Sequence, residues 1–325
     1  MSLNVFAKSE KLAAATLGLL DRQIVLGSLV ARDSGADFSG AAGDVVNIKR
    51  PSRLDGAEQD LRADNSGGIA SENLAEWKIS VPLDKHVYSA VDLSDAELTL
   101  DVADFGAQVL DPQAKTIVKR IEKKLAAALQ TAPAVGTVDV DKSTGEPIND
   151  AAVRKMIVKA RNVLNRQDVP VAGRYLVVGA DVESALLNDP LLIRVDTSGT
   201  DSVLRESIIG RLAGFTIVVS NDIDPGAAIA FHPSAYILVN RAPVVPSSAQ
   251  GSSSSYEGLS VRVMRDYNSH TASDRSFLST YVGIGEVLDA PEGTPKGQEA
   301  TAARQLRAVS FKLKPVTPKP DPEGK

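Results

Sequence analysis

The chain of 325 residues contains no cysteine, so neither disulfide bonds nor a cysteine-bound zinc ion can stabilise its fold. Aromatic residues make up only 4% of the sequence, which disfavours a surface on which nucleic-acid bases stack. No apolar run approaches the roughly 20 residues that a membrane-spanning helix needs. Lysines flank an alanine-rich stretch near the N-terminus, but we find no small-residue cleavage site there and expect no signal peptide.

The overall charge is mildly acidic, with a formal net charge of −5 and a sequence pI of about 5.4. A dedicated nucleic-acid-binding protein usually carries a basic face, so this charge argues against one. Hydrophobic residues make up 43% of the chain, which is enough for one large domain or two ordinary domains. Composition alone therefore predicts an ordinary soluble intracellular protein.

The usual catalytic and ligand-binding motifs are missing as well. The histidines His86, His232 and His270 lie far apart in the chain, and each lacks a second candidate ligand close by. No H-E-x-x-H, G-x-S-x-G or Walker A motif occurs, and Gly283–Gly285 lacks the third glycine of a dinucleotide-binding loop. We therefore predict no enzyme activity, no catalytic, cofactor-binding or metal-binding residues, and a packing role for His232.

One segment, Asp139–Asp150, has a partial likeness to a calcium-binding loop. Carboxylates occupy its first and third positions, but Thr144 stands where the loop needs glycine and Asp150 where it needs glutamate. We interpret the segment as a polar turn.

Near the N-terminus, apolar residues recur at helical spacing between Lys8 and Val30, which predicts an amphipathic helix interrupted only by Gly18 and Gly27. Its apolar face would consist of Leu12, Ala15, Leu19, Gln23, Leu26 and Val30. Because packing supplies most helical stability in water, this face needs a partner surface, which a neighbouring subunit could provide. A flexible link from Gly35 to Gly43 would follow.

Two alternating segments predict strands at Val45–Arg50 and Trp77–Leu83. The polar stretch between them, Ser52–Glu76, is too long for a tight hairpin, so we predict an extended β-arm with Trp77 packed at its base. Its tip carries two arginines and six carboxylates: Arg53, Arg62, Asp55, Glu58, Asp60, Asp64, Glu72 and Glu76. This surplus of negative charge has no partner within the arm.

Helical signals follow the arm. Asp101 is a suitable N-cap for a short helix to about Leu110, and Asp111-Pro112 predicts a second helix to about Gln130. Its apolar positions are Ile117, Ile121, Leu125 and Ala128, and its basic stripe consists of Lys115, Lys119, Arg120, Lys123 and Lys124. The stripe allows weak, sequence-blind contact with DNA but fits a solvated helix face equally well.

The rest of the chain mixes both kinds of element. Helices are predicted from Asn149 to Leu164, from Asp181 and from Asp201, and strands at Tyr175–Val178, Phe215–Ser220, Ala228–Phe231, Ser260–Arg265 and Ser276–Gly285. Composition predicts a loop at Ser247–Gly258, and Ala308–Lys314 could add one edge strand. The Pro-rich end of the chain is expected to be disordered.

The order of four segments along the chain resembles that of a known protein family. They are Gly43–Leu54, the run VPLDKHVYSAVDLSDAELTLDVADFGAQVLDPQAKTIVKRIEKKLAAAL at Val81–Leu129, Gly214–Ile223, and Ser273–Ile284. From about Leu12 to about Ala290 the chain resembles the major capsid proteins of tailed bacteriophages, specifically the coat-protein branch typified by the Salmonella podophage.

The resemblance implies an α+β fold, that of the tailed-phage major capsid proteins. Its parts would be an N-terminal arm (1–42), an extended β-arm (43–92), a peripheral domain around a long spine helix (93–145 and 256–290), an axial domain (146–255) and a Pro-rich tail (291–325). The arm would lie across the adjacent subunit, making inter-subunit contacts through Arg53, Asp55, Glu58, Asp60, Arg62 and Asp64. The basic stripe of the spine helix would face packaged DNA.

The implied function is structural, with no cofactor. The chain would self-assemble into hexamers and pentamers of an icosahedral head that encloses double-stranded DNA. Its other partners would be scaffolding and portal proteins and a decoration protein, with no membrane, and its place would be the virion, assembled in the host cytoplasm. Some phages of this fold cross-link their shells through an arm lysine, but none occurs between Lys49 and Lys78, so we predict a non-covalent shell.

Two alternatives stay open from the sequence. An encapsulin-like compartment would use the same fold around protein cargo, and nucleic acid inside native particles would exclude it. An uncharacterised α/β hydrolase or binding module would instead be a stable monomer with one deep pocket.

Overall fold

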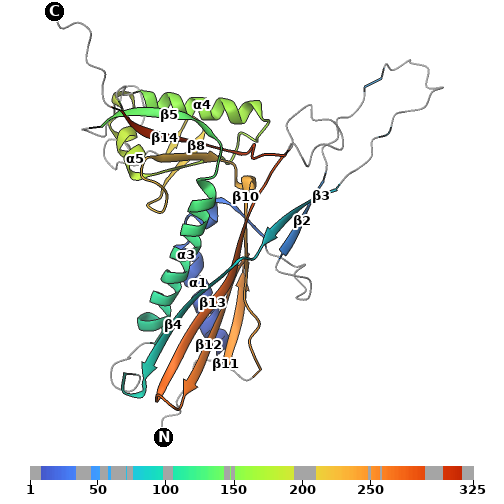
Figure 1. Cartoon of the computed structure of the whole chain (residues 1–325), viewed down its shortest axis with the longest axis vertical. Helices are drawn as coiled ribbons and strands as arrows, with labels where there is room; N and C mark the ends of the chain where they lie inside the picture. Colours follow the sequence, from blue (N-terminus) through green and yellow to red (C-terminus); the bar gives the residue numbers. More distant parts are fainter. Residues whose placement is uncertain are drawn as a thin grey trace, which may run out of the picture.

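The residues that the structure describes form two six-stranded sheets, a two-stranded ribbon and the helices that pack with them (Figure 1). The computed structural model describes residues 9–33, 45–51, 58–59, 71, 76–97, 105–142, 147, 151–193, 210–247, 250–256, 258–289 and 303–316. The first sheet and the long helix α3 (Asp111–Leu129) form an elongated half. The second sheet forms a shorter half at the end of α3.

The first sheet has the strand order β1-β10-β13-β12-β11, and β4 also pairs with β13. Its strands are β1 (Ala31–Asp33), β4 (Lys85–Ser94), β10 (Tyr236–Arg241), β11 (Gln250–Tyr256), β12 (Leu259–Asn268) and β13 (Ser273–Glu286). The strands predicted at Ser260–Arg265 and Ser276–Gly285 are confirmed within β12 and β13. The predicted loop at Ser247–Gly258 is wrong, because β11 pairs with β12 along its whole length. A strand needs backbone pairing and not apolar side chains, so four consecutive serines can form one.

The N-terminal segment forms two helices, α1 (Ser9–Gln23) and α2 (Leu26–Leu29), rather than one. The predicted interruptions at Gly18 and Gly27 are wrong, since the helix breaks at Ile24 and Val25.

The predicted apolar face is confirmed only in part: Leu26 and Val30 are buried, and Leu12 and Leu19 pack half-buried against the core. Ala15 is exposed, and the buried side of α1 consists of Ala13, Thr16, Leu17 and Leu20. This side packs in one core with the first sheet of the same chain and with α3, so the helix needs no neighbouring subunit to cover it.

The helix α3 lies along the first sheet and continues a π-helical turn, η2 (Gly106–Leu110). The predicted restart at Asp111 is wrong, because Leu110 and Asp111 both have helical backbone angles. A widened π-turn here suits Pro112, whose ring and missing N–H disturb a regular α-helical turn. The predicted end near Gln130 is confirmed, and Ile117, Ile121 and Leu125 are buried as expected, whereas Ala128 is only half-buried. Asp101 lies outside the described residues.

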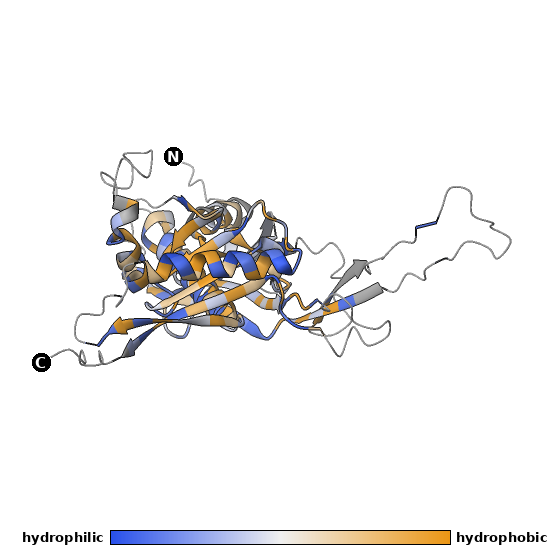
Figure 2. Cartoon of the chain, turned by 90° about the horizontal axis from the view of Figure 1, so that it is seen from above, coloured by the Kyte–Doolittle hydropathy of each residue, from blue (hydrophilic) through white to orange (hydrophobic). Residues whose placement is uncertain are grey.

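The arm begins with the predicted pair of strands, β2 (Val45–Pro51) and β3 (Glu76–Pro82), which pair in antiparallel register. Seen from above, this ribbon extends away from the body of the molecule (Figure 2). The side chain of Trp77 is not among those described, so its packing role stays a prediction.

The second sheet has the order β5-β14-β9-β6-β8-β7. Its strands are β5 (Ala134–Asp141), β6 (Tyr175–Val178), β7 (Arg211–Leu212), β8 (Phe215–Val219), β9 (Ala227–Phe231) and β14 (Ala308–Val316). The predictions for β6, β8 and β9 are confirmed. The prediction that Ala308–Lys314 is an edge strand is wrong: β14 lies between β5 and β9, where its apolar residues Ala308, Val309 and Phe311 are buried.

Helices α4 (Ala152–Arg166), α5 (Ala180–Leu187) and α6 (Pro190–Ile193) accompany this sheet, and a 3-10 turn, η3 (Pro233–Ala235), leads from β9 to β10. The helical period predicts an apolar stripe of Val153, Met156, Ile157, Ala160 and Leu164 on α4, and all of these are buried except Met156, which is half-buried. The predicted N-cap Asp181 is wrong: Gly179 precedes the helix with an extended backbone, and Asp181 lies in the first turn. Asn149 and the expected helix start at Asp201 lie outside the described residues.

The sheets do not follow the expected domain limits at every strand. Although β10 and all but the last residue of β11 fall within residues 146–255, both strands belong to the first sheet. Conversely, β5 and β14 fall outside that range but belong to the second sheet.

Candidate assembly surfaces

The base of the arm is fixed to the first sheet by close backbone contact. In the core at this point, Val46 and Val81 of the arm pack with Val239 of β10. On β13, a Cβ atom added at Gly283 would lie 2.4 Å from the carbonyl oxygen of Pro82, and one added at Gly285 would lie 2.3 Å from a methyl carbon of Val81. Glycine is therefore required at both positions. The close approach of the arm base accounts for Gly283 and Gly285, which do not belong to a nucleotide-binding loop.

The tip of the arm is described only in part. Glu58 is exposed, as a residue available for contact with another molecule must be. The other predicted contact residues, Arg53, Asp55, Asp60, Arg62 and Asp64, lie outside the described residues.

The predicted basic stripe forms an exposed surface of α3. Lys115, Lys119, Arg120 and Lys123 are all exposed, and Lys115 pairs with Asp111 at 2.6 Å. On the opposite side of the helix, Ile117 and Ile121 face the core. Lysine and arginine side chains on one side of a buried helix can approach phosphates without disturbing the fold.

Lys124 differs from the rest of the stripe because its ammonium group is already engaged. It forms an ion pair with Asp84, in the turn between β3 and β4, and donates to the carbonyl oxygen of Val282 at 3.3 Å. Burial raises the pKa of Asp84, but the hydrogen bond and charge of Lys124 outweigh it, so the pKa is lowered overall. Lys124 thus ties the end of the spine helix to the base of the arm.

A buried carboxylate that sequence reasoning missed holds the N-terminal segment on α3. Glu122 accepts backbone N–H bonds from Val25 at 3.2 Å, Leu26 at 2.8 Å and Gly27 at 3.0 Å. These groups are left without helical partners by the break between α1 and α2. Burial raises the pKa of Glu122, while the three N–H donors lower it. Only the charged residue at an otherwise buried helix position could have signalled this contact.

The side of the first sheet that faces away from α1 and α3 presents an aromatic cluster. Along β4, Val87 packs on the core while His86 and Tyr88 point the other way and are exposed. Tyr88 stacks on Phe277 with ring centroids 5.7 Å apart, and His86 meets Tyr281 edge-on at 5.0 Å. An exposed aromatic cluster of this kind is typical of a surface that contacts another protein.

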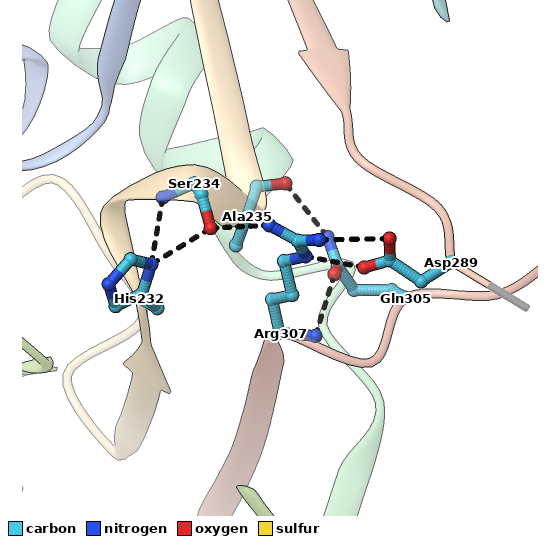
Figure 3. A network of polar contacts seen from close by, with 6 residues as sticks. All are labelled: His232, Ser234, Ala235, Asp289, Gln305 and Arg307. Atoms are coloured by element: carbon cyan, nitrogen blue, oxygen red, sulfur yellow. Dashed lines mark hydrogen bonds and ion pairs between the residues drawn. The ribbon is translucent and has the colours of Figure 1, made fainter. Parts of the chain in front are cut away.

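A polar network joins the two sheets where the chain passes between them (Figure 3). Arg307 forms an ion pair with Asp289 and donates to the hydroxyl oxygen of Ser234 at 2.7 Å. That hydroxyl lies 2.8 Å from Nδ1 of His232. His232 accepts from the backbone N–H of Ser234 and so caps η3, which corrects the predicted packing role.

Nothing in the described part of the chain resembles a catalytic or metal centre. His86 belongs to the aromatic cluster, His232 caps η3, and His270 lies in the turn between β12 and β13. The described residues contain no group of three or more histidines or carboxylates that could hold a metal ion. No helix among them is long and apolar enough to cross a membrane. In the Asp139–Asp150 segment, the first three residues belong to β5 rather than to a loop.

Comparison with solved structures identifies the fold. The chain matches a structure from Mycobacterium phage Che8 with a TM-score of 0.59 and 20% identity, covering 96% of this chain and 94% of that one. A capsid structure of cyanophage P-SCSP1u matches with a TM-score of 0.61 and 11% identity, over 97% and 91% of the two chains. A virus-like particle from Pyrococcus furiosus matches with a TM-score of 0.50 and 12% identity, over 93% and 98%. The predicted α+β fold of tailed-phage capsid proteins is thereby confirmed.

No curated protein matches the sequence. The profile of one family, described as phage capsid protein, matches residues 80–280. This span runs from the end of β3 to within β13, so it includes β4, the spine helix α3 and five of the six strands of the second sheet. The chain is therefore a structural, non-enzymatic protein, and it belongs to the phage capsid protein family.

Proposed function

We propose that this capsid protein assembles into hexamers and pentamers of an icosahedral head that encloses double-stranded DNA. The observation that carries the proposal is the arm, whose base is fixed to β13 by two glycines while its strands extend away from the body. An extended ribbon of this kind has no interior of its own and gains stability by lying on another surface. Repeated by symmetry, such contacts connect each subunit to the next.

The arm is proposed to dock on the adjacent subunit through Arg53, Asp55, Glu58, Asp60, Arg62 and Asp64. The excess of carboxylates at its tip favours a basic acceptor surface. Because the arm contains no lysine between Lys49 and Lys78, the shell is expected to be non-covalent. A ladder of cross-linked bands from mature particles on a denaturing gel would contradict this.

The basic surface of α3 is proposed to face the packaged DNA. Of the predicted residues Lys115, Lys119, Arg120, Lys123 and Lys124, the first four are exposed and Lys124 is engaged with Asp84. Contact of this type neutralises phosphates without reading sequence, so it weakens steeply as salt concentration rises.

The division into peripheral and axial domains remains a proposal, and each strand is now assigned to a domain by the sheet to which it belongs. The peripheral domain would consist of α1, α2, α3 and the first sheet, including β10 and β11, and the axial domain of the second sheet, including β5 and β14. Scaffolding, portal and decoration proteins are proposed as further partners, and the host cytoplasm as the place of assembly. The relation to the Salmonella podophage branch stays a prediction.

The first test is negative-stain electron microscopy of the purified chain, with light scattering on the same sample. Closed shells with fivefold and sixfold capsomers are the expected result, if necessary after co-expression with a scaffolding protein. A chain that stays monomeric under both conditions contradicts the proposal. Deleting Asp55–Asp64 should then abolish shells while the monomer keeps its circular dichroism spectrum, and normal shells from this deletion would rule out arm docking.

The second candidate is a protein compartment of the same fold without a genome. The match to a virus-like particle from Pyrococcus furiosus favours it, although its TM-score of 0.50 is lower than those of the two phage structures. Nuclease-protected DNA inside native particles would exclude the compartment, and particles that contain only protein would exclude the phage head.

A further inference from the structure

Three passages of the chain connect the two sheets, and the second and third are hydrogen-bonded to each other. The first, after α3, accepts at the carbonyl oxygen of Ala132 from the hydroxyl of Ser310 in β14, at 2.8 Å. The second is the segment 232–235 between β9 and β10. The third leaves β13 through residues 287–289 and enters β14 through residues 303–307.

The second and third passages share backbone hydrogen bonds as well as side-chain contacts. The N–H of His232 donates to the carbonyl oxygen of Arg307 at 3.1 Å, and the N–H of Val287 donates to that of Ala235 at 2.9 Å. Gln305 donates from its side-chain amide to the same oxygen of Ala235 at 3.1 Å (Figure 3). The angle between the sheets therefore depends on how tightly these two passages hold together.

In the side-chain network at this junction, the guanidinium of Arg307 can act only as a hydrogen-bond donor. Arg307 donates to the carboxylate of Asp289 and to the hydroxyl oxygen of Ser234. Since that oxygen already accepts from Arg307, its own hydrogen is free to point at Nδ1 of His232, 2.8 Å away. The backbone N–H of Ser234 also donates to Nδ1, at 3.3 Å. The backbone contact requires Nδ1 to be an acceptor, so His232 caps η3 only while Nδ1 carries no hydrogen, as in the neutral imidazole.

Protonation of His232 removes this acceptor. The imidazolium carries a hydrogen on Nδ1, which then opposes the backbone N–H of Ser234, so the cap on η3 is lost. The new positive charge also lies near two cations, Arg307 from the passage before β14 and Arg174 from the turn before β6. Asp289, the carboxylate of the network, is already paired with Arg307. Burial lowers the pKa of His232, and the charges of Arg307 and Arg174 lower it further.

We propose that His232 makes the junction an acid-sensitive joint, closed while the imidazole is neutral and loosened when it becomes protonated. In the closed state, His232 caps η3 and holds Ser234 where its hydroxyl accepts from Arg307, which links the second passage to the third. When the cap is lost, Ser234 is held less firmly against Arg307 and the relative angle of the two sheets becomes softer. This inference concerns the single chain and holds whether or not the chain forms a shell.

The pH window follows from the direction of the shift. Because the folded state lowers the pKa of His232, its contribution is complete above the unfolded pKa of about 6.5 and is lost as the pH falls through the folded pKa. The joint should be closed at pH 7.5 and should loosen towards pH 5.

The test is hydrogen exchange of the full-length chain, measured by mass spectrometry at pH 7.5 and pH 5.0 and corrected for the intrinsic rates. One protonation changes an opening equilibrium by at most about tenfold per pH unit, so exchange of the peptides covering 232–235 and 287–289 should rise ~3- to 10-fold in acid. Peptides of β6 should not change in this way. Equal protection of the junction at both values would overturn the proposal.

The deciding variant is His232→Asn. Asparagine is a favoured N-cap that can accept from the N–H of Ser234 but does not titrate, so the acid-induced rise should disappear. The matched control, His270→Asn, should retain it. A rise in His232→Asn equal to that of the unmodified chain would overturn the proposal.

A second variant keeps the test decisive if His232→Asn fails to fold. Ser234→Ala removes the bridge to Arg307 at every pH, so junction peptides should already exchange rapidly at pH 7.5 and respond little to acid. Slow exchange of Ser234→Ala at pH 7.5 would show that the bridge does not hold the joint.

Discussion

Strands β9 and β4 show how differently the two sheets are built. All five residues of β9 are buried, because β9 lies inside the second sheet with side chains packed on both faces. In β4 the half-buried residues alternate with exposed ones, since α3 covers only one face of the first sheet. Strand β9 is thus covered on both faces within the single chain, whereas the first sheet leaves a face with an aromatic cluster and an ion pair, Arg275–Asp92, open to other molecules.

The two regions therefore have different roles. The buried strands of the second sheet contribute to the stability of the single chain, and the exposed face of the first sheet is a surface for contact with other molecules. Burial of apolar area in the second sheet stabilises the single chain. The exposed face of the first sheet adds little to that stability but is available when subunits meet. Substitutions in the two regions should therefore differ in their effect on the stability of the single chain.

Truncation of Phe231 should have the largest effect. Phe231 is fully buried and meets the ring of Tyr236 edge-on at 6.1 Å. Phe231→Ala should lower the free energy of unfolding by about 3–5 kcal/mol, measured by urea denaturation. Its counterpart on the first sheet, Tyr88→Ala, should change it by less than about 0.5 kcal/mol, because that side chain is 59% exposed. Similar losses in both variants would break the comparison.

The buried carboxylate Glu122 should come next. Glu122→Gln replaces one acceptor oxygen with an amide that faces backbone donors, so it should cost roughly 2–4 kcal/mol of unfolding free energy. Amides of Val25, Leu26 and Gly27 should also exchange faster. The control Glu97→Gln alters an exposed carboxylate that accepts from Ser94, and little change is expected. If the two variants behaved alike, Glu122 would not hold the N-terminal segment.

The arm base should be sensitive to a single methyl group. In Gly283→Ala the new Cβ would lie 2.4 Å from the carbonyl oxygen of Pro82, which should cost about 1–3 kcal/mol and displace the arm. Faster proteolysis of the arm is the measurement. In the control Gly18→Ala nothing lies within 4 Å, so the variant should be as stable or slightly more stable. If proteolysis of the arm is unchanged in Gly283→Ala, the contact between β13 and the arm base does not hold the arm in place.

The exposed ion pair should have the smallest effect. Arg275 and Asp92 are 54% and 55% exposed, and their shortest contact is 2.6 Å. A double-mutant cycle with Arg275→Ala and Asp92→Ala should give no measurable coupling in the single chain, because water screens exposed pairs. Coupling that appears only in assembled particles would sharpen the comparison by placing this face in a contact.

Patterns with a local cause were predictable from the sequence. Alternation revealed β2 and β3, and a 3.6-residue period revealed the buried stripes of α3 and α4, because each pattern reflects which side of an element meets water. The resemblance of Val81–Leu129 to the family led to the correct fold. Local patterning failed for β11, whose serines carry no apolar signal, and for the buried face of α1, where two sides of the helix are apolar.

The sequence by itself determined most of the elements, the absence of cysteine chemistry and the position of an arm without lysine at its tip. Only the tertiary structure decided which distant residues meet. Glu122 lies 95 to 97 positions from the N–H groups that it accepts, Gly283 lies opposite Pro82, and Arg307 reaches Ser234 across 73 positions. Such contacts depend on chain topology and not on neighbouring residues, so no local pattern encodes them.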